Sequence, residues 1–476
     1  MFIYVRLLFL PVYVVDLLWS SLVLVYVRLI TSSSAFLLFF FSFRIWTTRI
    51  GSASSMLTDD ILLSIMERVD ITTCVRTSVL SNRWKHLPWL LRELNIDVKR
   101  FLSVPSPNPI EVKQMDEAMA SLTKAITSFL ATSRSEATIK RLQLRLYLVN
   151  DYSDAIGPIV SQAIDTGSVE GLDLAIVDEK EPDDCRDEEM LQQARTVDSF
   201  FSGFSAWEIQ APDSKLSVLE LSFCCLGELK VLCLPKLERL RWHTWISPKR
   251  PLSFDVVPSL KELSLVCGAI VDHRGFMLSE VLKDTTAVHN LTLNFQGERI
   301  WIKPEGKQLC TAFNKLRKLS LHGIFVEYDL LWTIVLLEAA TSIEIFDIEI
   351  WEHPCILDTE GRRQTFGERT NPSWKVAEFK SCKEWPLKEF QITGFSPMEQ
   401  QITLIRAIMQ RASNLQTIIL KDYQTCDYCE EIGALPRCER LPPERVFPKG
   451  KGEQDTAVEQ LIRDMPDCNI QIIFGN

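Results

Sequence analysis

One pattern of hydrophobic and polar positions, apolar-x-x-apolar-x-apolar, recurs along the chain between residues 139 and 420. In each copy the apolar residues beside the single x point to one face of a strand, and the x residues point to the other. Such a strand cannot bury its apolar face alone, so the copies must stack side by side. The pattern occurs as IKRLQL (139–144), VEGLDL (169–174), LSVLEL (216–221), LERLRW (237–242), LKELSL (260–265), VHNLTL (288–293), LRKLSL (316–321), IEIFDI (343–348), LKEFQI (387–392) and LQTIIL (415–420).

The spacing of these copies predicts a repeat solenoid. Most copies start 21 to 30 residues after the preceding one, close to the period of roughly 20–29 residues typical of leucine-rich repeats. Two longer gaps hold insertions or a degenerate repeat. They contain DEKEPDDCRDEE (178–189), which we interpret as a solvated loop, and GRRQTFGERTNPS (361–373). The fold class that we expect is α/β, with a curved parallel sheet and outer helices and loops.

The x positions of the repeats line the concave side of this sheet. Their charges are mixed in sign, which indicates a ligand-binding surface but does not identify the ligand. The candidate substrate-binding residues are Glu220, Arg239, Glu262, Thr292, Lys318 and Asp347.

The segments that flank the repeats also have recognisable patterns. The Pro-rich stretch SVPSPNPIEV (103–112) predicts a stiff linker and a domain boundary, and an amphipathic helix follows over residues 115–132. After the last copy, a helix over residues 454–464 and a strand over residues 469–474 are expected to close the open end of the array.

Residues 56–91 are predicted to form short helices with more apolar surface than they can bury by themselves. Thr58 can cap the first helix, whose apolar stripe is Ile61, Leu62, Ile65, Met66 and Val69. Thr72 or Thr73 can cap a second helix that ends before Pro88 and carries Val75, Val79, Leu80 and Trp84. The remaining apolar side chains must be covered by a neighbour, either in this chain or in another.

The first fifty residues do not fit a globular pattern. Leu7–Val27 is long enough to cross a bilayer, but Asp16 and Pro11 interrupt it. Three interpretations stay open for residues 1–50, namely an extension foreign to the fold, a membrane anchor, and a signal or targeting peptide.

Composition narrows the function classes. An apolar content of 46% with 24% charged residues is typical of a globular protein, and a net charge of −10 argues against general nucleic-acid binding. The 13 cysteines are scattered and odd in number, which indicates reduced thiols and a cytoplasmic or nuclear location.

Candidate chemistry is sparse. The sequence has no phosphate loop and no nucleophile or zinc-protease motif, and its six histidines are dispersed, so we expect no catalysis and no cofactor. Cys426, Cys429 and Cys438 have metal-like spacing, but only the distant Cys468 could be a fourth ligand, so we favour loop thiols. Trp84 and Trp242 are expected in the core, while His243 and Trp245 follow a strand, where loop residues often meet ligands.

The segment LTDDILLSIMERVDITTCVRTSVLSNRWKHL (57–87) closely resembles the plant F-box motif, with Thr58 where that family usually has proline. The repeats resemble the leucine-rich half of plant F-box proteins, and residues 385–420 resemble their FBD-type C-terminal region. This resemblance implies an apolar extension (1–55), an F-box (56–102), a Pro-rich linker (103–115), leucine-rich repeats (116–380) and an FBD-like region with a cap (381–476).

The resemblance also implies a function. The F-box would bind a Skp-type adaptor, which connects to a cullin and a RING protein in a ubiquitin ligase, and the repeats would bind the target protein. The implied adaptor-binding residues are Leu57, Ile61, Leu62, Ile65, Val79, Leu80 and Trp84. Two alternatives are a membrane-anchored repeat receptor without a ligase role and a hydrolase or transferase with an unrecognised site.

Overall fold

The computed structural model describes residues 58–69, 71–77, 84–102, 112–131, 138–147, 150–177, 207–222, 228–243, 245, 250–285, 287–352, 360–374, 384–423, 446–463 and 470–475. The chain divides into two compact units, Met1–Val69 and Asp70–Asn476.

Helix α3 (Asp59–Met66) is the described helix of the first unit. Asp59 and Asp60 occupy its first turn, where the helix dipole favours acidic side chains. Thr58 is at the N-cap, and its carbonyl accepts a hydrogen bond from the Leu62 amide at 3.2 Å. The Thr58 side chain makes no capping hydrogen bond, so the expected side-chain cap is wrong. Its side chain is exposed, where water can satisfy the hydroxyl.

The second unit begins with α4 (Ile71–Thr77), whose buried residues include Ile71 and Cys74. This helix contacts the short 3₁₀ helix η1 (Leu87–Leu90) and strand β1 (Glu93–Asp97). Trp84 lies in a turn after α4, not on a helix as the sequence pattern predicted, and its side chain is half-buried.

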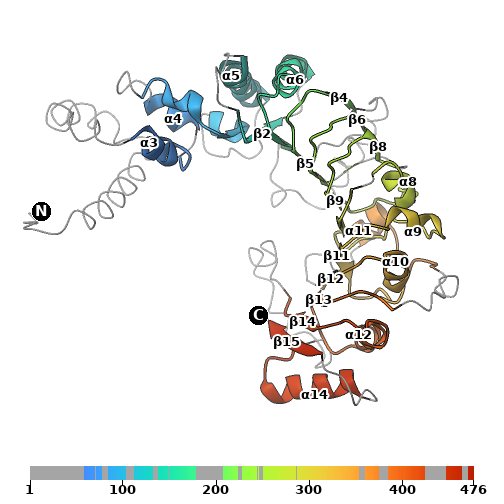
Figure 1. Ribbon diagram of the computed structural model, residues 1–476. Helices are drawn as coiled ribbons and strands as arrows, with labels where there is room; N and C mark the ends of the chain where they lie inside the picture. Colours follow the sequence, from blue (N-terminus) through green and yellow to red (C-terminus); the bar gives the residue numbers. More distant parts are fainter. Residues whose placement is uncertain are drawn as a thin grey trace, which may run out of the picture. The chain divides into compact units, whose positions relative to one another are not determined.

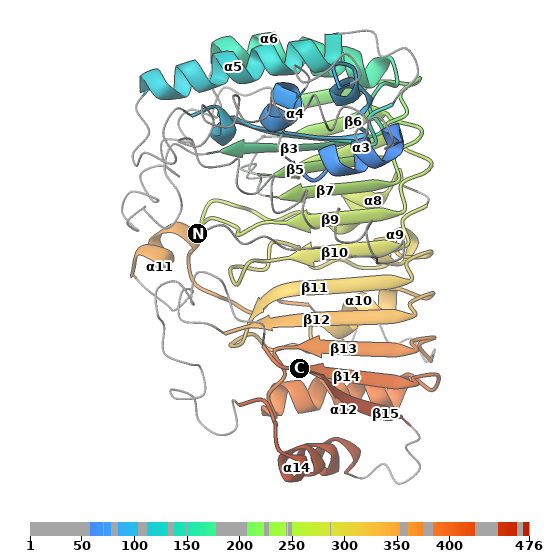
Figure 2. The same ribbon diagram turned by 90° about the vertical axis from the view of Figure 1, so that its left-hand side faces the viewer.

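A 12-stranded parallel sheet forms the centre of the second unit, as Figure 2 shows. All ten copies of the sequence pattern form strands of this sheet, and β1 and β15 are added at its two edges. The strands are β1 (Glu93–Asp97), β2 (Arg141–Tyr147), β3 (Gly171–Val177), β5 (Val218–Ser222), β7 (Arg239–His243), β9 (Glu262–Val266), β10 (Asn290–Asn294), β11 (Lys318–Phe325), β12 (Ile345–Trp351), β13 (Glu389–Thr393), β14 (Thr417–Lys421) and β15 (Gln471–Gly475).

The strand register explains why the sequence pattern folds in this way. Each pairing aligns the same apolar positions of adjacent repeats, for example Leu240 with Leu263 and Leu263 with Leu291. These leucines are at most 1% exposed, so they form a continuous apolar column behind the sheet. Since each column continues into the next repeat, burial of one strand depends on its neighbours.

Helices and a second sheet cover the apolar face. Figure 1 shows α8 (Leu278–Leu282), α9 (Gln308–Ala312), α10 (Thr333–Ala339) and α12 (Glu399–Arg411) on one side of the large sheet. Beside β5–β9, this layer is a three-stranded parallel sheet of β4 (Trp207–Gln210), β6 (Leu229–Cys233) and β8 (Leu252–Val256). Strands β6 and β8 lie in the two shortest intervals between pattern copies, from 216 to 237 and from 237 to 260, which leave room for a short strand in place of a helix.

The sheet begins earlier in the sequence than expected. Strand β1 precedes the Pro-rich segment, and it pairs in parallel with β2, from Glu93 with Arg141 to Asp97 with Arg145. Helix α5 (Val112–Ala131), which agrees with the predicted amphipathic helix, contacts both strands, and it packs against α6 (Asn150–Asp165). The Pro-rich segment therefore connects a strand and a helix of the same layered structure.

The C-terminal end of the sheet agrees with the predicted closing elements. Strand β15 pairs with β14, and α14 (Lys451–Ile462) contacts α12. Leu461 and Ala457 of α14 are buried. These elements cover the last repeat and give the solenoid a C-terminal cap.

Candidate functional site

Every second residue along the strands of the large sheet points away from the apolar face that the helices cover. Equivalent residues of neighbouring strands therefore form rows across the sheet. We call this surface the open face; on β9 it consists of Glu262, Ser264 and Val266. Parallel register places equivalent open-face residues of adjacent strands beside each other. A ligand that crosses the strands would therefore meet side chains from several repeats.

The six predicted substrate-binding residues all lie on the open face, on six neighbouring strands. Glu220 is on β5, Arg239 on β7, Glu262 on β9, Thr292 on β10, Lys318 on β11 and Asp347 on β12. The six side chains share one surface of the sheet, but they do not line a single pocket. Whether they bind a target stays a prediction.

Ion pairs between repeats dominate the end of the open face near β2. The Arg141 guanidinium is 3.1 Å from the Asp173 carboxylate and 2.9 Å from that of Glu220. Arg239 and Glu262 form a further pair across β7 and β9. Arg141 and Asp173 are not among the six predicted binding residues, although both are x positions of the repeat pattern. These exposed pairs order the side chains more than they stabilise the fold.

The centre of the open face is nearly free of charge. Ser264, Thr292 and Ser320 are aligned on β9, β10 and β11. Asn294, beside His322, continues this polar, uncharged region. Ser264 and Thr292 are half-buried, so their hydroxyl groups can still hydrogen-bond to a ligand, whereas Ser320 is only 2% exposed.

His322 and Asp347 form a partly buried polar contact on the open face. His322 Nε2 lies 3.0 Å from Asp347 Oδ2, and the Asp347 side chain is 12% exposed. Burial raises the pKa of Asp347, but the hydrogen bond and charge of His322, with the charge of Lys318, offset this and hold the pKa below its ordinary value. Asp347 therefore remains an anion that also accepts a hydrogen bond from Gln391 Nε2 at 3.3 Å.

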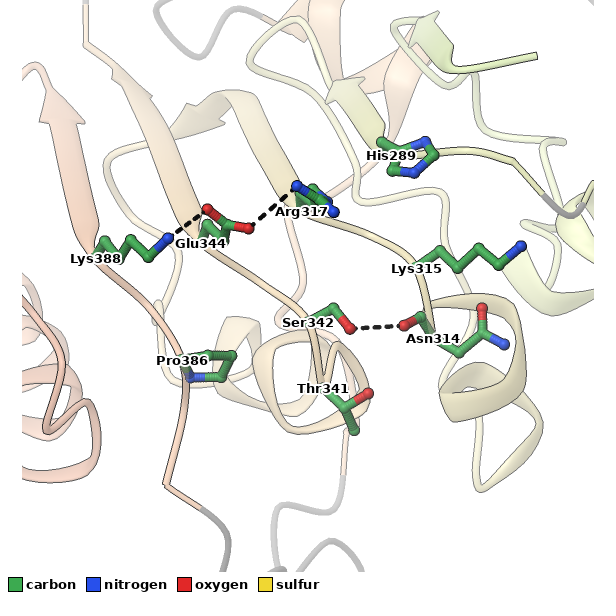
Figure 3. Close-up of a pocket in the computed structure, with 9 residues that line it drawn as sticks. All are labelled: His289, Asn314, Lys315, Arg317, Thr341, Ser342, Glu344, Pro386 and Lys388. Atoms are coloured by element: carbon green, nitrogen blue, oxygen red, sulfur yellow. Dashed lines mark hydrogen bonds and ion pairs between the residues drawn. The ribbon is translucent and has the colours of Figure 1, made fainter. Parts of the chain in front are cut away.

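A pocket lies along the N-terminal ends of strands β10–β13 (Figure 3). We call it the edge pocket; its volume is about 490 Å³, and it is lined by His289, Asn314, Lys315, Arg317, Thr341, Ser342, Glu344, Pro386 and Lys388. Glu344 lies between two cations, with Lys388 Nζ at 2.8 Å and Arg317 at 3.5 Å. The hydrogen bond and charge of Lys388 lower the pKa of Glu344.

The predicted adaptor-binding residues differ in exposure. Ile61 is 47% exposed, whereas Leu62 is 1% exposed. Ile65 and Trp84 are half-buried. Leu57, Val79 and Leu80 lie outside the described residues. Among the described residues of α3, Ile61 is therefore the predicted contact that is most accessible to a partner.

Trp245, considered as a ligand-binding residue, belongs to the core, whereas His243 is the half-buried last residue of β7. Trp245 is 3% exposed, and its ring centroid lies 5.0 Å from that of Trp301. The Trp245 Nε1–H donates a hydrogen bond to Nε2 of His273 at 3.2 Å. His243 contacts Gln296 at 2.9 Å, and Trp242 is fully buried, as expected. The suggestion that Trp245 meets a ligand is therefore wrong, because neighbouring repeats enclose it.

Two further sequence predictions concern residues that the structure does not describe. Cys426, Cys429, Cys438 and Cys468 lie outside the described residues, and the described part of the chain contains no cluster of metal-binding side chains. The apolar segment 1–50 also lies outside them. Within the described ranges, no helix has both the length and the apolar character needed to span a bilayer.

Comparison with protein families identifies both parts of the chain. The F-box domain model matches residues 54–88, and the model of the At1g61320/AtMIF1 LRR domain matches residues 209–462. The second range passes through residues 385–420, whose likeness to an FBD-type region stays a prediction. No match is found among the curated proteins. Since the repeat model covers more than half of the sequence, the chain belongs to the At1g61320/AtMIF1 LRR domain family, and it carries an F-box domain before its repeats.

Proposed function

We propose that this protein is the substrate-recognition subunit of a Skp–cullin–F-box ubiquitin ligase. The proposal rests on the presence, in one chain, of an F-box domain and a leucine-rich-repeat sheet with a polar open face. F-box domains generally bind Skp-type adaptors, and F-box proteins with leucine-rich repeats are typically non-catalytic. Ubiquitin transfer would be carried out by the enzyme that the cullin and the RING protein recruit.

On the adaptor side, the proposal rests on apolar surface that α3 leaves uncovered. The exposed Ile61 would pack against the Skp-type adaptor, and burial of its accessible half would contribute about 1 kcal/mol. Leu62 is already buried, so it would support the shape of the helix. Val75 of α4, which is 39% exposed, is a second apolar residue of the F-box range available to a partner.

On the target side, the open face offers an extended surface with a neutral centre. Ion pairs lie on one side of the centre and the His322–Asp347 contact on the other. A protein target could therefore hydrogen-bond to the side chains of Ser264 and Thr292 and match charges at either end. Recognition by several repeats at once is typical of solenoid binding surfaces.

Adaptor binding can be tested with two substitutions on the same helix. The full chain is co-expressed with a plant Skp-type adaptor as the wild type, as Ile61→Asp, and as Ser64→Asp. Ser64 is also exposed on α3, so it controls for the added charge. We expect Ile61→Asp to abolish adaptor recovery and Ser64→Asp to retain it, while both variants show the wild-type thermal transition of the repeats. Equal recovery of adaptor with all three chains would refute the proposal.

The proposed complex requires the repeats to face the cytoplasm or the nucleus. The apolar character of residues 2–43 supports a second candidate, a membrane-anchored repeat receptor without a ligase role. Fractionation of plant cells that express the tagged full chain, combined with protease protection, separates the two. A repeat domain that is protected inside the cell supports the ligase subunit, whereas repeats digested from outside intact cells support the receptor.

A further inference from the structure

We propose that the edge pocket binds an anionic side chain of the target, in an acidic or phosphorylated peptide segment. This inference rests on the proposed function, because it names the chemical class of the segment that the repeats would recognise. The pocket lining contains none of the six substrate-binding residues predicted from the sequence.

The charge of the pocket supports an anionic ligand. The pocket lining contains three basic side chains, Lys315, Arg317 and Lys388, but a single carboxylate, that of Glu344, although the chain as a whole has a net charge of −10. Arg317 and Lys388 are 63% and 54% exposed. Glu344 holds these two cations in place and neutralises only part of their charge. An incoming anion would therefore find positive charge that is already positioned.

Several polar groups of the pocket have no bonding partner among the described residues. The Lys315 ammonium, the Thr341 hydroxyl and the Asn314 side-chain amide take part in no ion pair or hydrogen bond within this part of the chain. The Ser342 hydroxyl donates to the Asn314 carbonyl at 2.8 Å, and its oxygen can still accept. Figure 3 shows Asn314 and Ser342 joined near the Lys388–Glu344–Arg317 line. A carboxylate or phosphate could accept hydrogen bonds from the lysine, threonine and asparagine groups.

The position of the pocket favours a peptide over a free small anion. Arg317, Glu344 and Lys388 each come directly before the first residue of a strand, so the next residues, Lys318, Ile345 and Glu389, lie in register on the open face. A segment bound along the open face could thus place one acidic side chain in the pocket. A nucleic acid is the weaker candidate, because the pocket holds three basic side chains and the chain is acidic overall.

The repeat structure supplies a matched control. Lys315 lies three residues before the first residue of β11, and Lys236 lies three residues before the first residue of β7. Both side chains are exposed and lie at the same edge of the sheet. Lys315→Glu and Lys236→Glu therefore make the same charge change at equivalent positions, one in the pocket and one outside it.

The test uses the full chain purified with its adaptor and measures the fluorescence anisotropy of labelled peptides. The probes are a peptide with a central Asp/Glu run, the same peptide with Asn and Gln, and a third peptide with phosphoserines. We expect the acidic peptide, the phosphoserine peptide or both to bind more tightly than the amide peptide. We also expect Lys315→Glu to weaken that binding about fivefold to tenfold, and Lys236→Glu to leave it unchanged. Whichever of the acidic and phosphoserine peptides binds more tightly shows whether a carboxylate or a phosphate is the preferred ligand.

Three results would overturn the inference. These are equal binding of the acidic, phosphorylated and amide peptides, an equal effect of both lysine substitutions, and displacement of the acidic peptide by a single-stranded oligonucleotide at lower concentration. Adaptor recovery from the same preparations reports on the ligase role separately. A chain that binds adaptor but no acidic peptide would refute the pocket alone.

Discussion

Arg362 and Glu298 form an ion pair in which the two side chains are only 8% and 6% exposed. Arg362 belongs to α11 (Glu360–Phe366), in the long insertion between β12 and β13, whereas Glu298 follows β10. Arg369 of the same insertion lies 4.0 Å from Glu298, and its guanidinium carbon lies 3.5 Å from the centre of the Phe325 ring. The described part of the insertion is thus attached to the repeats by buried charges.

Removing Arg362 should destabilise the repeats strongly. Arg362→Ala removes the nearer ion-pair partner of the buried Glu298 carboxylate and leaves Arg369 at 4.0 Å, so we expect the free energy of unfolding to fall by about 3 kcal/mol. Arg363 is its neighbour in sequence, but 48% exposed, so Arg363→Ala should cost less than about 1 kcal/mol. Urea denaturation followed by circular dichroism measures both values. Similar losses for the two variants would show that the buried pair is not important for stability.

His273 should make stability depend on pH. Burial, together with the charges of Arg299 and Lys303, lowers the pKa of His273 from 6.5 to about 4. The unfolded chain takes up a proton near pH 6.5, whereas the folded chain resists it until about pH 4. The stability that the neutral ring contributes is therefore complete above pH 6.5, and about 3 kcal/mol of it is lost as the pH falls to 4.

His273→Gln tests this pH dependence. The variant lacks the titrating group but keeps a side chain that can accept the hydrogen bond from Trp245. We expect the difference in unfolding free energy, wild type minus variant, to decrease steadily between pH 6.5 and 4. Urea titrations at several pH values provide the measurement. If the two pH profiles are parallel, His273 is not the group responsible.

Two glycines should respond to alanine in opposite directions. Gly394 has a φ of +77°, and a Cβ there would meet the Ile350 carbonyl oxygen, so Gly394→Ala should cost at least about 2 kcal/mol. Gly452 lies in the first turn of α14, where a Cβ would meet nothing within 4 Å. Gly452→Ala should therefore stabilise the protein by about 0.5 kcal/mol. Thermal denaturation distinguishes the signs, and equal shifts in the same direction would contradict the explanation.

Thr292→Arg should separate target binding from folding. The substitution places a long cation at the uncharged centre of the open face, and we expect it to reduce target recruitment while stability changes by less than about 1 kcal/mol. Thr456→Arg on α14 is the control, since Thr456 is exposed and lies on a helix and not on the open face. Both variants should retain adaptor. Unchanged recovery of targets with Thr292→Arg would show that the open-face centre is not used.

The repeat strands were predictable because each carries its own local pattern. The first strand carries it too, since LRELNI (91–96) has the same apolar spacing, with Leu91, Leu94 and Ile96 at most 2% exposed. It was missed because the Pro-rich segment after it suggested a domain boundary. The general position of the six open-face residues was also predictable, because every second residue of a strand faces the same side.

Other features depend on contacts between distant repeats. Nothing local in the sequence pairs Arg362 with Glu298, or groups Lys315, Glu344 and Lys388 around one pocket. Residues at the first x of the pattern line the edge pocket, whereas the six predicted binding residues are at x positions within the strands. The enclosure of Trp245 likewise depends on Trp301 and Phe276 from later segments.

The central claim is that this chain brings target proteins to a ubiquitin ligase through its F-box. Proximity labelling in plant cells, with and without a proteasome inhibitor, tests it most directly when the wild-type full chain is compared with Ile61→Asp. We predict a set of labelled proteins that increases with inhibitor for the wild type, and a labelled set that does not respond to inhibitor for Ile61→Asp, together with loss of the labelled adaptor. If the labelled proteins and their response to inhibitor are the same for both chains, the claim is contradicted.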